Sequence, residues 1–281
     1  MPIVADLLES GRTRLREAGI EPSARESALL LGRLLGIGEA SVLARDTEAV
    51  PPEVEARFFE LVARRSSGEP TAYLVGEREF WGRPFWVDRR VLIPRPETEH
   101  LVEIAFSLPL PERARVLDVG TGSGCIAISL AADRPQWRVG GSDVSLGALA
   151  VARANAVRNG VADRLALFSA DLTDGVDLSA VDLVVGNPPY VEEAIVPYLS
   201  RDVRDFEPRV ALTIGSDGFD ATRRLLAAAA AMRPGTWVVL EFGFGQGEGV
   251  LGIADATGHF DLAELRPDLA GIERDVVLRR G

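Results

Sequence analysis

The segment Asn187-Pro188-Pro189-Tyr190 contains residue types that suit one particular chemistry. A planar NH₂ group, as in an amide or adenine, is a poor nucleophile because its lone pair is delocalised. Two acceptors, the Asn187 side-chain oxygen and the Pro188 carbonyl, would hold its two hydrogens and aim the lone pair at an electrophilic methyl group. The Tyr190 ring would stack on its plane, and the two prolines would stiffen the loop. We predict Asn187, Pro188 and Tyr190 as catalytic and all four residues as substrate-binding. The plainer alternative is a turn that ends a strand.

A glycine-rich turn is the second candidate for chemistry. It follows Asp118 between a β-type run and a helical run, and it reads Gly120-Thr121-Gly122-Ser123-Gly124. Glycine lets a backbone approach a ligand closely, and a helix N-terminus offers free N–H groups. The dinucleotide fingerprint needs a glycine where Cys125 stands. The spacing therefore favours S-adenosylmethionine over NAD, since there is no pyrophosphate to cradle. A turn without a ligand is the alternative.

Residues at the ends of the following strands would complete this cofactor site. Asp143 ends the next predicted strand, where a carboxylate can accept both ribose hydroxyls. Asp171 and Leu172 follow the third strand, where an adenine ring would lie. Asn187 would lie between cofactor and substrate, so we count it with both.

Strands and helices alternate through the region that holds these motifs. Repeated βα units imply a parallel sheet with helices on both faces, and open α/β sheets bind ligands at the carboxyl ends of their strands. We predict an α/β, doubly wound, Rossmann-like fold with a mostly parallel seven-stranded sheet, closed by a hairpin that adds one antiparallel strand. The predicted strands are 115–119, 137–142, 165–169, 181–185, 237–242, 260–265 and 274–279.

The first part of the chain predicts a separate helical domain. Ala28, Leu31 and Leu35 recur at helical spacing, and Gly36 follows as a stop. Residues 80–87 have the pattern of a β-hairpin with a Gly-Pro turn. We divide the chain into a helical substrate-docking domain (residues 1–72), a β-hairpin linker (73–94) and the domain that carries both motifs (95–281).

The composition excludes several classes of chemistry. All 31 basic residues are arginine, so Schiff-base and P-loop lysines are absent. One cysteine and two histidines exclude a disulfide within the chain and the common zinc sites, and we expect no metal.

Charge and hydropathy limit the partners. The net charge is −11, mostly from residues 91–281, which makes a phosphate backbone a poor partner, and we expect no direct nucleic-acid binding. No apolar run reaches the roughly 20 residues of a membrane span, and the N-terminus lacks a basic signal region. We expect a cytoplasmic protein with no membrane partner.

Several longer segments resemble the HemK/PrmC family of release-factor glutamine methyltransferases over nearly the whole chain. The Asn-Pro-Pro-Tyr motif is shared with adenine and other amino methyltransferases, whereas Ile-Pro-Arg-Pro-Glu-Thr-Glu and Glu-Phe-Trp-Gly are much more specific. The matching segments are residues 68–76, 79–82, 91–99, 118–124, 186–190, 206–212 and 217–218.

The resemblance implies a class I S-adenosylmethionine-dependent methyltransferase. Its expected reaction is N5-methylation of the glutamine in the Gly-Gly-Gln motif of class 1 peptide-chain release factors, by a protein that we expect to be a monomer. It implies Gly120–Gly124 and Asp143 as cofactor contacts and Asn187–Tyr190 as the glutamine pocket. Leu172 departs from the family, which often has an aromatic residue beside the adenine. Glu97 and Glu99 either line the cleft or cap the helix after Pro96.

Three alternatives stay open. An adenine-N6 methyltransferase would use the same motif on a flipped DNA or RNA base, but should show a basic face. A ribosomal-protein glutamine methyltransferase would have the same catalytic motif. A binding module without catalysis is disfavoured by the intact Asn187–Tyr190 segment.

Overall fold

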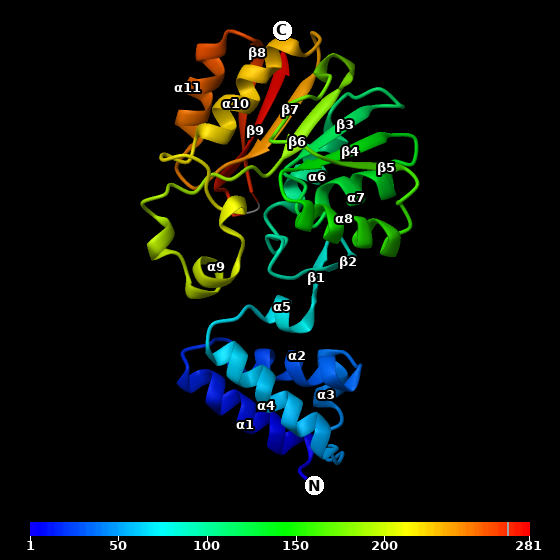
Figure 1. Ribbon diagram of the computed structural model, residues 1–281, viewed down its shortest axis with the longest axis vertical. Helices are drawn as coiled ribbons and strands as arrows, with labels where there is room; N and C mark the ends of the chain where they lie inside the picture. The colour runs from blue at the N-terminus through cyan, green and yellow to red at the C-terminus, as the bar shows by residue number, and fades with distance from the viewer. Residues whose placement is uncertain (269) are drawn as a thin grey trace. The chain divides into compact units, whose positions relative to one another are not determined.

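The computed structural model describes residues 1–268 and 270–281, which form two compact units (Figure 1). One unit contains Met1–Glu77 and Ser200–Phe206, and the other contains Arg78–Leu199 and Glu207–Gly281. The sequence did not predict that a segment from the second half of the chain would join the helical unit. The short helix α9 (Arg201–Phe206) lies in this segment. The Arg201 side chain lies so close to Gly68 that a Cβ there would be 2.9 Å from its Cδ atom.

The helical unit is built around one apolar core. Leu7, Leu15, Leu30, Leu31 and Phe58 are almost completely buried in it. In the first helix the buried residues Val4, Leu7, Gly11 and Leu15 recur every three or four positions, so that helix presents one apolar stripe to the core. The helices are α1 (Val4–Glu17), α2 (Ser23–Leu35), α3 (Glu39–Leu43), α4 (Pro52–Ser66) and α5 (Thr71–Val75).

The larger unit contains a seven-stranded sheet in the order β5-β4-β3-β6-β7-β9-β8. The first five strands in this order are parallel, and β9 runs antiparallel to both of its neighbours. The predicted fold is therefore confirmed, including the closing hairpin. The strands are β3 (Arg115–Val119), β4 (Arg138–Asp143), β5 (Leu165–Ser169), β6 (Leu183–Gly186), β7 (Trp237–Glu241), β8 (Phe260–Pro267) and β9 (Glu273–Arg280).

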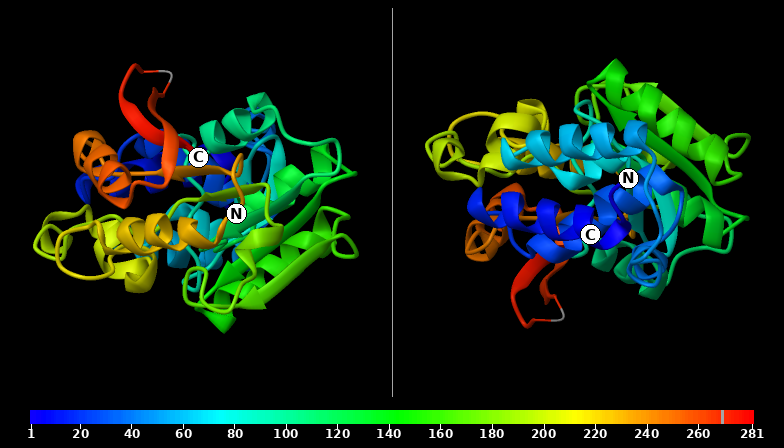
Figure 2. Two further views of the ribbon diagram at one scale, coloured as in Figure 1. Left: turned by 90° about the horizontal axis from the view of Figure 1, so that it is seen from above. Right: turned by 90° about the horizontal axis from the view of Figure 1, so that it is seen from below.

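Helices cover both faces of this sheet because its strands are apolar on both sides (Figure 2). Val116 faces one core and Leu117 the other, as the alternation of strand side chains requires. The first core includes α6 (Glu99–Ser107), α7 (Cys125–Asp133) and α8 (Leu146–Arg158), and the second includes α10 (Asp220–Ala228) and α11 (Gly247–Thr257). Helix α10 ends at Ala228, and Ala229–Ala231 continue it as a 3₁₀ turn.

A two-stranded hairpin, β1 (Glu77–Phe80) and β2 (Arg83–Trp86), precedes the sheet in the chain. Its turn lies at Trp81 and Gly82, with φ angles of 53° and 66°, and not at the predicted Gly-Pro step. Two positive φ values match the twist of a tight hairpin. Trp81 tolerates its conformation because its backbone N–H donates to Glu99 and its indole N–H donates to Asp133.

Candidate active site

The glycine-rich turn wraps around a buried carboxylate, Asp118, at the end of β3. One oxygen of Asp118 accepts hydrogen bonds from the Thr121 hydroxyl at 2.6 Å and from the Ala127 N–H at 3.2 Å. Burial raises the pKa of Asp118 to about 7. The carboxylate thus ties strand, turn and helix α7 together. From the sequence, Asp118 stands out only by its spacing from the glycines, and no role for it could be predicted.

The five predicted turn residues have different roles. Gly120 and Gly122 have φ values of 71° and 55° and line a pocket beside the turn. Thr121 and Ser123 are almost completely buried and line an adjoining hollow. Gly124 is not among the described residues that line either space; its φ of 82° favours glycine, and a Cβ there would lie 2.8 Å from the Ile128 side chain.

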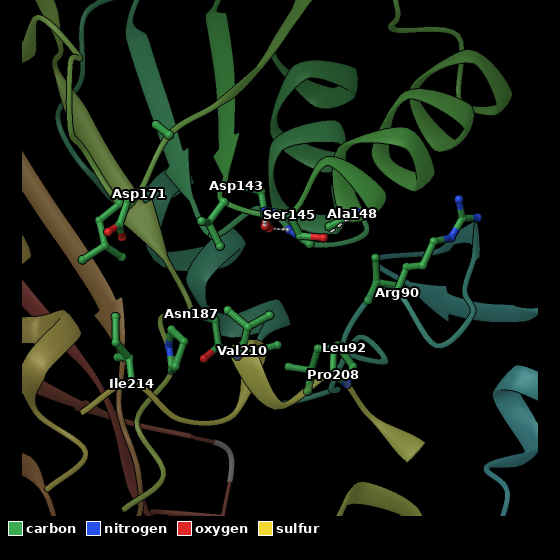
Figure 3. Close-up of a pocket in the computed structure, with 18 residues that line it drawn as sticks. Arg90, Leu92, Asp143, Ser145, Ala148, Asp171, Asn187, Pro208, Val210 and Ile214 are labelled. Carbon is green, nitrogen blue, oxygen red and sulfur yellow. Dashed lines mark hydrogen bonds between the residues drawn. The ribbon is translucent and has the colours of Figure 1, made fainter. Parts of the chain in front are cut away.

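Asp143 lies at the end of β4 and lines the same pocket (Figure 3). One of its oxygens accepts from the Gly122 N–H at 2.9 Å, and the other accepts from the Ser145 N–H at 2.8 Å. Burial raises the pKa of Asp143, and these two backbone donors oppose the shift. Each oxygen keeps a lone pair for a further donor, so the carboxylate can accept from a pair of hydroxyls.

Asp171 and Leu172 also line the pocket. Leu172 has a φ of 54°, and its carbonyl accepts from the Ser142 hydroxyl at 3.1 Å. Asp171 is half exposed and pairs with Arg224 at 3.0 Å. These contacts hold the loop after β5 at the rim of the pocket.

The opposite wall of the pocket is apolar. Figure 3 shows its labelled side chains facing Asp143 and Asp171 across the opening, and they are Leu92, Pro208, Val210 and Ile214. No role for these four residues was predicted from the sequence. The available signal was that segments 91–99 and 206–212, which hold Leu92, Pro208 and Val210, match the family, but no chemistry in their residue types marked them as a pocket wall.

The Asn-Pro-Pro-Tyr segment begins where β6 ends beside the glycine-rich turn. A Cβ at Gly186 would lie 2.6 Å from the Val119 carbonyl oxygen, so only glycine allows β6 to end so close to β3. Asn187 consequently lines both the pocket and the adjoining hollow. Pro189 lines the pocket, whereas Pro188 and Tyr190 are not among the described residues that line either space.

A chain of buried hydrogen bonds runs from Asn187 into the protein. The Asn187 side-chain nitrogen donates to the Thr98 hydroxyl at 3.2 Å, and that hydroxyl donates to Glu241 at 2.7 Å. The other Glu241 oxygen accepts from the Tyr190 hydroxyl at 3.2 Å. Burial, together with nearby Asp275, raises the pKa of Glu241 to about 7.

The backbone of Tyr190 is also fixed. Its carbonyl accepts from the Gln246 side chain at 2.9 Å, and a Cβ at Gly218 would come within 2.4 Å of that carbonyl oxygen. This contact explains why a glycine stands at position 218 in the Asp217-Gly218 segment. The loop after β6 is therefore rigidly attached to the loop after β7.

Glu97 and Glu99 do not line the predicted cleft. Glu99 accepts from the Trp81 backbone, and both glutamates border a separate hollow beside His100. Within the described ranges 1–268 and 270–281, no group of acidic, histidine and cysteine side chains could hold a metal ion. Over the same ranges, no helix combines the length and apolar character that a membrane span needs.

The fold and this site define the class. A glycine-rich turn after β3, an acid at the end of β4 and an Asn-Pro-Pro-Tyr segment after β6, on a sheet of this order, make the protein a class I S-adenosylmethionine-dependent methyltransferase. The PrmC N-terminal domain model matches residues 6–76, and the methyltransferase small domain model matches residues 98–199. The chain belongs to the release factor glutamine methyltransferase family.

The relatives match over nearly the full length. The release factor glutamine methyltransferase of Cereibacter sphaeroides is 43% identical over 276 residues, which cover 98% of each chain. That of Nitratidesulfovibrio vulgaris is 41% identical and covers 98% of this chain and 94% of its own.

Solved structures show the same fold at low identity. The hMettl16 catalytic domain in complex with the MAT2A 3′UTR hairpin 6 has a TM-score of 0.57 and 18% identity, covering 78% of this chain and 82% of that one. A methyltransferase from Pyrococcus furiosus has a TM-score of 0.51 and 18% identity, covering 72% and 91%. At this identity the likeness concerns the fold alone.

Proposed function

We propose that this protein transfers a methyl group from S-adenosylmethionine to the side-chain amide nitrogen (N5) of the glutamine in the Gly-Gly-Gln motif of class 1 peptide-chain release factors. The observation that carries the proposal is the position of Asn187, which borders both the pocket of the glycine-rich turn and the adjoining hollow. An amide at that point could hold a substrate nitrogen next to a bound methyl donor. The full-length relatives named for glutamine methylation support the same substrate.

The residues around the pocket fit the proposed donor. S-adenosylmethionine, when bound, supplies a methyl group on a positively charged sulfur. Gly120 leaves open space where a Cβ would stand, so the backbone can approach a ligand closely. Asp143 would accept from the ribose hydroxyls, and Leu172 would lie against the adenine with Asp171 beside it. The apolar wall around Val210 would cover the ring from the other side.

The chain's own residues would act by positioning and not by strong base catalysis. The Asn187 side-chain oxygen and the Pro188 carbonyl would hold the two amide hydrogens, with Pro189 and Tyr190 shaping the rest of the glutamine pocket. The new nitrogen–carbon bond forms as the sulfur–carbon bond breaks, and the nitrogen then loses one of its two hydrogens as a proton. An N-methylated amide nitrogen that still holds both hydrogens is strongly acidic, so water can take this proton. Catalysis would therefore come from the orientation of the amide and from the fixed dipoles of the Asn187 side chain and the Pro188 carbonyl.

Further parts of the proposal concern the partner. We propose that residues 1–72 form the docking surface for the release factor and that the protein acts as a monomer in the cytoplasm, without direct nucleic-acid binding. The acidic net charge of −11 supports a protein partner over a phosphate backbone. The adenine-N6 alternative is not favoured by the names of the full-length relatives.

A labelling experiment tests the substrate. The full-length protein would be incubated with radiolabelled donor and, separately, purified release factor, ribosomes or DNA. We expect label in the release factor and not in the other two. Label in ribosomal protein or DNA at a comparable rate would contradict the proposed substrate.

A further inference from the structure

We propose that Thr98 and Glu241 are positioning residues that fix the orientation of the Asn187 amide, so that its oxygen and not its nitrogen faces the substrate. This inference rests on the proposed function, because it concerns how the glutamine nitrogen is held. The two residues come from outside the Asn-Pro-Pro-Tyr motif: Thr98 precedes α6, and Glu241 ends β7.

The hydrogen-bond chain allows only one arrangement of hydrogens when Glu241 is ionised. A carboxylate only accepts, so each of its oxygens takes a hydrogen from a neighbouring hydroxyl. Thr98 supplies one at 2.7 Å and Tyr190 the other at 3.2 Å. Thr98 has a single hydroxyl hydrogen, and once it is donated to Glu241 this hydroxyl can only accept from its other neighbour.

That neighbour is Asn187, whose side-chain nitrogen lies 3.2 Å from the Thr98 oxygen. If Asn187 turned its amide over, its oxygen would face a hydroxyl that has no hydrogen left to give. Thr98 and Glu241 are each only 3% exposed, so water cannot easily supply the missing partner. The Asn187 nitrogen is thereby committed to Thr98, and its oxygen must point the other way.

The reaction requires this orientation. A glutamine NH₂ brings two hydrogens and needs two acceptors, of which Asn187 supplies one. A reversed Asn187 would present its own NH₂ to the substrate NH₂, donor against donor. Glu241 thus determines which way the hydrogen bonds point from Asn187 through Thr98 to its own carboxylate. It fixes how Asn187 faces the substrate without touching the substrate itself.

The test compares Thr98→Val with Thr98→Ser at pH 8.5, in single-turnover reactions with a release factor and saturating donor. Valine has the shape of threonine without the hydroxyl, whereas serine keeps it. We expect Thr98→Val to lower the single-turnover rate about 10- to 100-fold through misplacement of Asn187. Thr98→Ser should restore most of the rate, and the saturating donor removes any effect on donor affinity, because Asn187 also borders the donor pocket.

Thr236→Val is the matched structural control. Thr236 is similarly buried directly before β7, and its hydroxyl donates to the Val181 carbonyl at 3.1 Å. This variant also loses one buried hydrogen bond, but it should keep the wild-type rate. A fall in the rate like that of Thr98→Val would mean that the Thr98 effect reflects general loosening, and would overturn the proposal.

A double-mutant comparison separates positioning from a direct effect. If Thr98 acts through Asn187, Thr98→Val should lower the rate no further in a protein that already carries Asn187→Ala. Independent, multiplying losses would overturn the inference, as would a Thr98→Val rate equal to wild type. Failure of the proposed function would look different, because the wild-type protein itself would then leave the release factor unlabelled.

Discussion

Asp143 is held in place by the protein before any ligand arrives. Backbone N–H groups of Gly122 and Ser145 fix its two oxygens, one in the glycine-rich turn and one at the start of α8. A carboxylate fixed in this way loses little freedom when it accepts further hydrogen bonds, so its interaction with a ribose can be strong. Its charge remains partly desolvated, which the raised pKa reflects.

We therefore expect Asp143→Ala to weaken donor binding. Loss of a charged acceptor removes about 1.5–3 kcal/mol, or about 10- to 150-fold in Kd by calorimetry. Asp143→Asn keeps one acceptor oxygen, so its donor affinity should lie between those of the wild type and Asp143→Ala. Asp255→Ala, at an exposed position of α11, is the control and should bind donor as the wild type does. Unchanged affinity in Asp143→Ala would remove this residue from the proposed site.

Among the elements, the sequence predicted the strands and helices well because their apolar patterns are clear. The sequence also predicted that the glycine-rich turn, Asp143 and Asn187 lie at one edge of the sheet, since the carboxyl ends of parallel strands meet there. It could not predict the Thr98–Glu241 contact, which joins residues 143 positions apart through two buried polar groups. The hairpin turn at Trp81 was missed as well, because its conformation depends on Glu99 and Asp133 and not on local residue types.

The close approach of β6 to β3 predicts that a side chain at Gly186 would disturb the packing of these two strands. Gly186→Ala would place a Cβ 2.6 Å from the Val119 carbonyl oxygen, so β6 must shift. We expect a loss of about 1–3 kcal/mol in the free energy of unfolding. Turnover should also fall at saturating donor, because Asn187 follows directly in the chain.

Gly252→Ala is the control for this substitution. Gly252 lies within α11 with no atom near its added Cβ, and alanine there should stabilise the helix by up to about 1 kcal/mol. Chemical denaturation and single-turnover assays of both variants would check the pair. Equal stability and equal turnover in Gly186→Ala and wild type would contradict the packing argument.

For the whole molecule, buried acids make stability depend on pH. Burial raises the pKa of Asp118 and Glu241 to about 7 and that of Asp275 to about 6, above the ordinary values of 3.8, 4.5 and 3.8. At a pH between the ordinary pKa values and the raised ones, the folded protein binds more protons than the unfolded chain. The free energy of unfolding therefore falls as the pH rises. The stabilisation is full below about pH 4 and is lost as the pH passes through 6 to 7.

We expect the protein without donor to be less stable at pH 8 than at pH 5.5 in urea denaturation. Between these two pH values the contribution of Glu241 alone is on the order of 2 kcal/mol, since its pKa is raised from 4.5 to about 7 and part of the loss occurs below pH 5.5. Glu241→Gln should reduce the difference between the two pH values. A wild-type protein that is equally stable or more stable at pH 8 would contradict this account of the buried acids.

The division of the chain into two units also makes a prediction. A fragment of residues 78–281 should bind the donor as the full chain does, because every residue of the proposed donor site lies in the larger unit. It should methylate release factor poorly, since the proposed docking surface is missing. Equal turnover by the fragment and the full chain would contradict substrate docking by residues 1–72.

The central claim is that Asn187 and the Pro188 carbonyl select and hold a glutamine NH₂ group, and mass spectrometry of the modified release factor tests it most directly. Wild-type protein with saturating donor should add one methyl group at the glutamine of the Gly-Gly-Gln motif. It should add none to a release factor with glutamate there, because a carboxylate has no hydrogens to offer and brings charge into a buried site. Asn187→Ala should methylate the glutamine about 10²–10³-fold more slowly in single turnover. Methylation of the glutamate variant, or near wild-type glutamine methylation by Asn187→Ala, would contradict the claim.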